Sequence, residues 1–225
     1  GAVLLELHAL SFAAHHYLLY GVESAPGIFL SAALLTYFIC DYLTFEEIHL
    51  YTYDLFAERV GFKLGWGCIA FYPFFYTIPL WSTVHLDPAS SQTGWLIPAG
   101  LIFLSGWSLS RGANLQKYFF KRAPSYAFLG IVPEAITDGQ RSLLVNGFWG
   151  LSRHINYLGE ILMAIGIVLA TGHPEVLWGW LYPLYYVLLL FPRQIDDDKR
   201  CALKYGPLWD TYLKRVPHRI IPKVY

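Results

Sequence analysis

The sequence is poor in charge, in cysteine and in the motifs that mark soluble nucleotide-binding proteins. Lysine, arginine, aspartate and glutamate make up 14% of its 225 residues, whereas soluble domains usually carry about 25%. Its three cysteines lie too far apart for a disulfide framework or a zinc site. It contains no glycine-rich phosphate loop and no His-Glu-x-x-His pair, so we expect no metal ion. A net charge of zero gives no general attraction for nucleic acid.

Apolar residues, by contrast, are abundant and occur in long stretches. The chain is 56% hydrophobic and 18% aromatic, and its mean hydropathy is +0.41. A helix that crosses a bilayer needs roughly 20 mostly apolar residues. Six stretches of uneven length are candidates, of which the first is weakened by Glu6, His8, His15 and His16: 2–20, 26–45, 64–82, 94–110, 158–171 and 176–192. We therefore predict an all-α, polytopic transmembrane helical bundle of about six spans, kinked at Pro73, Pro79, Pro98 and Pro183.

The positive charges support this span count. All 16 lysines and arginines lie in three regions: two before the third span, six within 111–153 and eight within 193–223. The connections 21–26, 83–93 and 172–175 contain none. Six spans place the three basic regions and both termini on one side, which the positive-inside rule makes cytosolic. The membrane is that of the endoplasmic reticulum or a bacterial inner membrane.

A basic block, Arg111-Gly112-Ala113-Asn114-Leu115-Gln116-Lys117, follows the fourth span. If the helix continues, Asn114, Lys117 and Lys121 share one face. Such a face suits a phosphate-bearing cofactor, because lysine and arginine are the usual phosphate partners. It equally suits contact with lipid headgroups.

A second polar cluster, Arg153-His154-Ile155-Asn156-Tyr157, stands immediately before the fifth span. Histidine, asparagine and tyrosine provide directional hydrogen bonds. An interfacial belt of aromatic and basic residues explains the arginine and the tyrosine, but it does not need the other two. We interpret the cluster as part of a site for a polar ligand.

Two further features concern aromatic and acidic side chains. The spacing of Tyr205, Trp209 and Tyr212 places three rings along one helical side, against a membrane or a flat ring of a ligand. Asp41 lies within the second span, near Tyr37. Because an ionisable group inside a membrane is costly, Asp41 is either functional or held by a structural hydrogen bond.

Four blocks together resemble the membrane sterol reductases of the delta-14, delta-7 and delta-24 types, which include the membrane domain of the lamin B receptor. They are Glu46-Glu47 with Asp54-Leu55 and Gly61-Phe62; the Arg111–Lys117 block; Gly147-Phe148-Trp149-Gly150 with Arg153-His154-x-Asn156-Tyr157-x-Gly159; and Cys201 through Lys204-Tyr205-Gly206, Trp209, Tyr212 and Arg215-Val216-Pro217-x-Arg219-Ile220-x-Pro222. The resemblance implies a bundle of about ten spans, of which this chain is the C-terminal part. It also implies NADPH as cofactor, bound from the cytosolic side, and a sterol or related polycyclic lipid as substrate. The implied reaction is protonation of a sterol double bond, of the delta-14 or delta-7 type, followed by hydride transfer.

The resemblance also assigns roles along the chain. It implies spans in 1–110, a cytosolic cofactor-binding segment in 111–157, a helical hairpin in 158–192 and a cytosolic tail in 193–225. The implied proton donors are Tyr212, Asp41 and Tyr37. The implied cofactor-binding residues are Asn114, Lys117, Lys121, Trp149, Arg153, His154, Asn156, Tyr157, Arg193, Asp197, Tyr205 and Arg215.

The sequence departs from the family pattern in places and leaves two alternatives open. Asp196 stands where the family often has arginine, and Ala57 where it has histidine. Methyltransferases that act on membrane lipids or prenylcysteine with S-adenosylmethionine share the Arg-His-x-x-Tyr-x-Gly and Arg-Val-Pro patterns. A sterol-binding scaffold without enzymatic activity is the other alternative. For a tyrosine to act as the acid, a neighbouring charge or hydrogen bond must lower its pKa from about 10.

Overall fold

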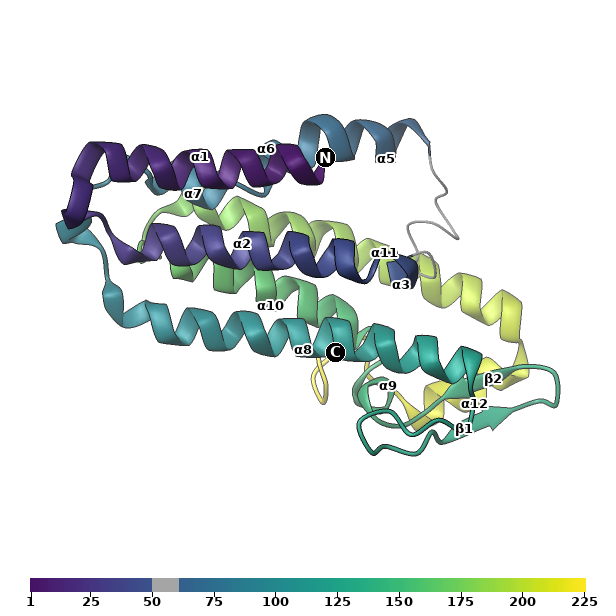
Figure 1. The fold of residues 1–225 in the computed structure, drawn as a ribbon. Coiled ribbons are helices and arrows are strands. Elements are labelled where there is room, and N and C mark those ends of the chain that lie inside the picture. Colours follow the sequence, from purple (N-terminus) through teal and green to yellow (C-terminus); the bar gives the residue numbers. More distant parts are fainter. Residues whose placement is uncertain (50–60) are drawn as a thin grey trace. The chain divides into compact units, whose positions relative to one another are not determined.

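The computed structural model describes residues 1–49 and 61–225, and this part of the chain is mainly helical (Figure 1). It forms two compact units. The first consists of Gly1–Leu104 with Met163–Tyr185, and the second of Ser105–Leu162 with Tyr186–Tyr225. Three long helices contribute residues to both units: α8 (Leu96–Arg122), α10 (Ile155–Ala170) and α11 (Leu181–Tyr205). Residues 54, 55, 57 and 59, on which parts of the resemblance and the charge pattern depend, lie outside the described residues.

In the first unit, α1 (Ala2–Tyr20) packs against α2 (Pro26–Thr44). The turn between them is held by the buried His16, whose Nε2 accepts a hydrogen bond of 3.0 Å from the Ala25 amide. Its Nδ1 must therefore carry the ring proton, and it lies 2.8 Å from the Val84 carbonyl oxygen. One histidine thus joins three segments of this unit.

The third predicted span is not one continuous helix. It consists of α5 (Phe62–Trp66), a π-helical turn (Gly67–Phe71), α6 (Tyr72–Phe75) and α7 (Ile78–Thr83). Pro73 and Pro79 each lack an amide hydrogen and clash with the preceding turn. The short helix α3 (Glu46–His49) precedes this region. The kinks predicted at Pro98 and Pro183 are not required, because both prolines lie in the first turn of a helix, α8 and α11 respectively. In a first turn the missing amide hydrogen breaks no hydrogen bond of the helix.

Within the described residues, two helical stretches are long and apolar enough to cross a membrane: Ala2–Glu23 and Pro26–Thr44. The apolar helix α10 is shorter. The fourth and sixth predicted spans belong to helices that continue beyond their apolar part. As a result, the basic block at 111–117 lies on α8 and the start of the predicted tail lies on α11.

The second unit adds elements that the all-α prediction did not contain. Strands β1 (Ala135–Thr137) and β2 (Ser142–Leu144) form a short antiparallel hairpin, and β1 packs against α12 (Pro207–Arg215). Helix α9 (Phe148–Leu151) precedes α10. A Cβ added to Gly159 of α10 would lie 2.5 Å from the Gly106 carbonyl oxygen of α8, so only glycine permits this close approach.

Candidate functional site

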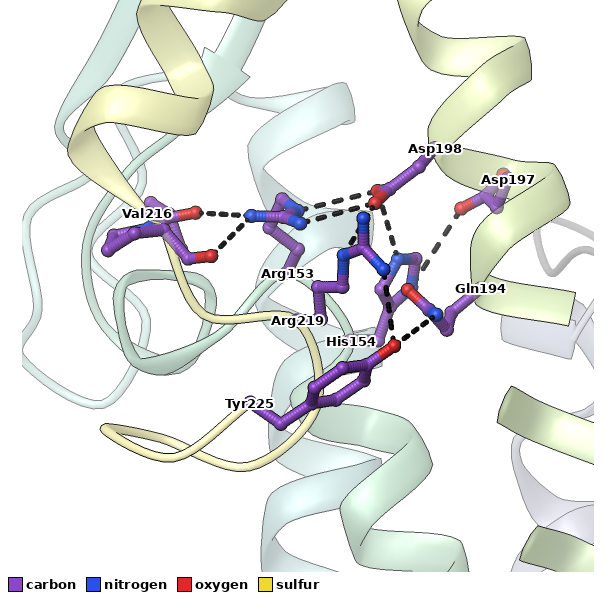
Figure 2. A network of polar contacts seen from close by, with 9 residues as sticks. Arg153, His154, Gln194, Asp197, Asp198, Val216, Arg219 and Tyr225 are labelled. Atoms are coloured by element: carbon purple, nitrogen blue, oxygen red, sulfur yellow. Dashed lines mark hydrogen bonds and ion pairs between the residues drawn. The ribbon is translucent and has the colours of Figure 1, made fainter. Parts of the chain in front are cut away.

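The Arg-His cluster lies in the second unit, beside the extended C-terminal segment. The backbone amide of Arg153 donates to the His218 carbonyl at 2.9 Å, and that of His154 donates to the Arg219 carbonyl at 2.7 Å. These bonds fix the segment before α10 against residues that are more than sixty positions away in the sequence. Figure 2 shows the polar network that results.

Arg153 is the centre of this network. One terminal nitrogen of its guanidinium donates to the carbonyls of Val216 and Pro217 at 2.9 and 2.8 Å. The other lies 3.2 Å from Asp198 Oδ2, and Nε lies 3.4 Å from Asp198 Oδ1 (Figure 2). The side chain is buried. Its hydrogen-bonding capacity is therefore directed to the protein itself, which makes Arg153 a residue that positions the C-terminal segment.

The partner of Arg153 is an ionised carboxylate. Burial opposes the charge on Asp198, but contacts from His154 and Arg153 outweigh this effect and hold the pKa of the carboxyl below its usual range. The Nε of Arg219 lies 3.5 Å from the same carboxylate (Figure 2). Asp198 thus balances two guanidinium groups and must stay charged for the network to hold.

His154 lies between two acidic side chains of α11. Its Nε2 is 3.5 Å from Asp198 Oδ1, and its Nδ1 is 3.9 Å from Asp197 Oδ2 (Figure 2). These distances exceed those of good hydrogen bonds, so we interpret both contacts as electrostatic. The imidazole also stacks on Tyr157, with ring centroids 5.0 Å apart. Three of the predicted site residues, His154, Tyr157 and Asp197, are therefore close together.

Several members of this network were not among the predicted residues. Gln194 is fully buried and donates from Nε2 to the Tyr225 hydroxyl at 3.1 Å, to which Arg219 also donates at 3.1 Å (Figure 2). The signal was present in the sequence, because positions 194, 198, 201 and 205 are spaced as one face of a helix. The prediction took Asp197 from the family resemblance and did not include Asp198.

A second group of predicted residues gathers around Trp149. The indole Nε1 donates to the Ala113 carbonyl at 2.8 Å, and the Lys117 ammonium lies 5.4 Å from the ring centroid. Burial lowers the pKa of Lys117, and the negative charge of Asp197 only partly opposes this. Within the described residues, the Lys117 ammonium makes no ion pair. It is a half-buried cation that packs on an aromatic ring.

The two sequence blocks that carry this group fit together closely. The Gln116 Oε1 accepts a hydrogen bond of 3.0 Å from the Phe148 amide. A Cβ on Gly112 would lie 2.3 Å from the Phe148 ring, and a Cβ on Gly147 would lie 2.1 Å from Gln116 Nε2. The glycines of the two blocks therefore allow α8 and α9 to approach and hold Trp149 over Lys117.

Asn156 and Arg193 are also in this unit, on α10 and α11, and both are half-buried. The Asn156 Oδ1 is buried and has no hydrogen-bond partner among the described residues. A buried acceptor without a donor costs about 1–3 kcal/mol, so this atom is suited to a ligand that donates a hydrogen bond.

Tyr212 lies in an apolar cluster with Val145, Trp209 and Val216, and Tyr205 packs against it. Burial raises the pKa of the Tyr212 hydroxyl above its ordinary value, and the charge of Arg153 only partly offsets this. The lowered pKa that a tyrosine acid requires is therefore not found here.

Other predicted residues lie apart from the network. Arg215 is exposed and pairs with Glu134, next to the hairpin. Asn114 is half-buried on α8, and Lys121 lies one turn beyond Lys117, where burial lowers its pKa. Asp196 pairs with Arg200 on the exposed side of α11.

The remaining predicted proton donors, Asp41 and Tyr37, belong to α2 and hence to the first unit. The Tyr37 ring packs edge-on against Phe103 at 5.9 Å. The Asp41 backbone carbonyl accepts a hydrogen bond from the Phe45 amide at the helix end. Neither contact assigns a catalytic role.

Comparison with known proteins agrees with the blocks quoted above. The family profile described as "Ergosterol biosynthesis ERG4/ERG24 family" matches residues 1–225. A delta(14)-sterol reductase of Arabidopsis thaliana is 38% identical over 188 residues, which is 84% of this chain and 50% of that protein. A delta(14)-sterol reductase of Methylotuvimicrobium alcaliphilum is 36% identical over 228 residues, covering 100% of this chain and 52% of that protein. A 7-dehydrocholesterol reductase of Xenopus laevis is 32% identical over 235 residues, covering 100% and 49%.

The chain thus spans about half the length of the curated relatives that it matches. The match nevertheless extends over the whole of this sequence, including the Trp149 group and the Arg153 network. The chain belongs to the ergosterol biosynthesis ERG4/ERG24 family.

Proposed function

We propose that this chain takes part in the NADPH-dependent reduction of a carbon–carbon double bond in a sterol. The names of its relatives support the reaction class, since they are delta(14)-sterol and 7-dehydrocholesterol reductases. The observation that carries the cofactor is the half-buried ammonium of Lys117, which packs on Trp149 and makes no ion pair within the part of the chain that the structure describes. A phosphate group supplies the missing negative charge.

The residues of the second unit fit this cofactor. Lys117 and Lys121 provide positive charge for the phosphates. The Asn156 Oδ1, which has no hydrogen-bond partner among the described residues, accepts a hydrogen bond from a ribose hydroxyl or a carboxamide. Tyr205 and Trp149 offer flat apolar faces for a heterocyclic ring. When bound, NADPH supplies the hydride. The Arg153–Asp198 network holds the C-terminal segment in place, so Arg153 and His154 act by positioning the site.

The proton that the alkene receives must come from an acid. Tyr212 is the candidate in the second unit, although burial raises its pKa and so makes it a weaker acid, and Asp41 and Tyr37 are the candidates in the first unit. A residue that only shapes the site changes cofactor affinity, whereas a proton donor changes turnover. Substitution of each with measurement of both quantities separates these roles.

We also propose that the protein is a multi-pass membrane protein with its basic segments on the cytosolic side. The apolar stretches Ala2–Glu23 and Pro26–Thr44 and the family itself support a membrane location. The distribution of the 16 lysines and arginines supports the orientation. A sterol then enters from the lipid phase, while NADPH binds from the cytosol.

The test uses the purified chain in detergent with NADPH and a panel of delta-14, delta-7 and side-chain unsaturated sterols, analysed by mass spectrometry. We expect one sterol to gain two hydrogens. Lys117→Gln should weaken NADPH binding by about tenfold or more, because it removes a charge-assisted contact. Lys214→Gln, which removes an exposed lysine of α12, is the control and should leave binding unchanged. Thermal stabilisation by S-adenosylmethionine and not by NADPH would overturn the proposal in favour of a methyltransferase.

A further inference from the structure

A short segment of the second unit exposes several large hydrophobic side chains. Residues 123–133, the apolar turn, leave the end of α8 and lead to β1 (Figure 1). Tyr126, Leu129 and Val132 are 49%, 74% and 68% exposed, whereas Phe128 between them is buried. Large hydrophobic side chains gathered on one exposed segment mark a surface that contacts a membrane or another protein.

The backbone of the apolar turn has a conformation that does not suit leucine. Phe128 and Ile131 exchange two backbone hydrogen bonds, of 3.2 and 2.9 Å, around Leu129 and Gly130. Both central residues have positive φ angles, of 50° and 77°. Such a turn favours asparagine or aspartate before the glycine, because the Cβ of other residues is crowded at positive φ. Leucine stands at the tip against this preference, which indicates that its exposed side chain has a partner.

Aromatic contacts hold the apolar turn beside α8. Phe128 packs against Phe119 of α8, with ring centroids 5.8 Å apart, and against Phe148 of α9, at 6.5 Å. A Cβ on Gly112 would lie 2.3 Å from the Phe148 ring, so this ring lies at the level of Gly112 along α8. The turn therefore runs back from the end of α8 and lies beside the stretch 112–119.

That stretch is close to the end of the apolar part of α8. The predicted fourth span ends at residue 110, so residues 112–119 lie about 3–14 Å beyond it, because each helical residue adds about 1.5 Å. The headgroup layer on each side of the hydrocarbon core is about 5–8 Å thick. The two ranges overlap, which puts the apolar turn at the height of the lipid headgroups.

The charges around the apolar turn suit the same surface. Residues 118–133 include Lys121 and Arg122 and contain no aspartate or glutamate. Both cations are exposed, and the Arg122 guanidinium packs 4.5 Å from the centroid of the Tyr118 ring. Glu134, the first acid that follows, pairs with Arg215. Anionic lipids of a cytosolic leaflet attract basic residues near the membrane, so cations beside apolar tips match a lipid surface.

We propose that the apolar turn is a membrane-interface anchor, which inserts the side chains of Tyr126, Leu129 and Val132 into the cytosolic leaflet. These side chains leave water at the headgroup level, while the neighbouring cations contact anionic headgroups. The anchor also fixes the segment before α9 at this height, because the Asn146 side-chain amide donates to the Val132 carbonyl at 2.7 Å. The inference rests on the proposed membrane topology and is independent of the reductase reaction.

The test places an environment-sensitive fluorophore on single cysteines of the membrane-embedded chain. The three native cysteines are first replaced by serine. The chain is then reconstituted in lipid nanodiscs of phosphatidylcholine and phosphatidylglycerol. The labelled variants are Leu129→Cys, Leu101→Cys in the apolar part of α8 and Lys214→Cys on α12, and all three positions are exposed. Quenching by nitroxide-labelled lipid reports contact with the bilayer, and quenching by iodide reports contact with water.

We expect nitroxide-labelled lipid to quench the label at position 129 at least about threefold more strongly than the label at position 214, and iodide to quench it more weakly. A second variant separates anchoring from folding. Leu129→Asn suits the positive φ angle and removes the apolar tip. It should therefore leave Tm in detergent unchanged or higher, while a label at Val132→Cys loses about half or more of its quenching by lipid.

The failures of the anchor and of the topology are distinguishable. If iodide quenches positions 129 and 214 equally and lipid quenches neither, while lipid quenches position 101, the anchor is overturned and the membrane topology stands. If lipid does not quench position 101 either, the proposed topology itself fails. Shielding of position 129 from both quenchers would also overturn the inference, because protein and not lipid then covers the turn.

Discussion

Removal of one negative charge, in Asp198→Asn, should destabilise the second unit strongly. The carboxylate is 15% exposed and its partner Arg153 is 5% exposed, and the two are 3.2 Å apart. Breaking such a buried pair leaves an uncompensated charge and costs roughly 3–5 kcal/mol. The asparagine amide still accepts one hydrogen bond, so we expect about 3 kcal/mol. For a chain of this length that corresponds to a fall in Tm of about 6–12 °C.

The neighbouring aspartates provide matched controls for this prediction. Asp196 pairs with Arg200, and both side chains are about half exposed. Such a surface pair contributes at most about 1 kcal/mol, so Asp196→Asn should lower Tm by no more than about 4 °C. Asp197→Asn should fall between the two, since Asp197 is 3.9 Å from His154 and 21% exposed. The assay is thermal unfolding in detergent at one scan rate, followed by circular dichroism.

The pH dependence gives a second, independent check. The pKa of Asp198 is lower in the folded than in the unfolded chain, so the unfolded state binds its proton more readily. Its contribution is therefore present above the unfolded value of about 4 and is lost as the pH falls through the folded pKa. The difference in Tm between parent and Asp198→Asn should be the same at pH 6 and pH 8 and should shrink below about pH 4. Equal losses for Asp198→Asn and Asp196→Asn at pH 7 would refute the reasoning.

Three further predictions concern packing, a buried histidine and the proton donor. Gly159→Ala should lower Tm, measured by differential scanning fluorimetry, and cost about 1–3 kcal/mol of stability, because the alanine Cβ would overlap the backbone of α8. Gly100→Ala is the control: its Cβ would have no neighbour within 4 Å, so Tm should change by no more than about 2 °C. His16→Ala should cost about 2–4 kcal/mol in chemical denaturation, because it leaves a buried amide and a carbonyl without partners; a similar loss for the exposed His15→Ala would contradict this. Tyr212→Phe should keep NADPH affinity within about twofold and slow single-turnover reduction, and an unchanged rate would exclude Tyr212 as the acid.

Local sequence patterns predicted the helices well where packing did not interfere. The expected spans 2–20 and 26–45 correspond to α1 and α2, and the faces of α8 and α11 follow ordinary helical spacing. The third span was less predictable. Its apolar residues indicate one helix, but Pro73 and Pro79 and the π-helical turn divide it into short pieces. The small hairpin was missed because a pair of three-residue strands gives almost no periodic signal.

The sequence by itself determined the family, the apolar character and the blocks from which the site is built. The motifs around Lys117, Trp149 and Arg153 were readable because each is continuous in the chain. Only the tertiary structure decided what each side chain contacts. It directed Arg153 to Asp198 and to the backbone of the C-terminal segment, placed the Lys117 ammonium against Trp149, and brought Arg141 to Lys204. The physical reason is that a charge is balanced by whatever lies within a few ångströms, and in a folded chain those neighbours come from distant positions in the sequence.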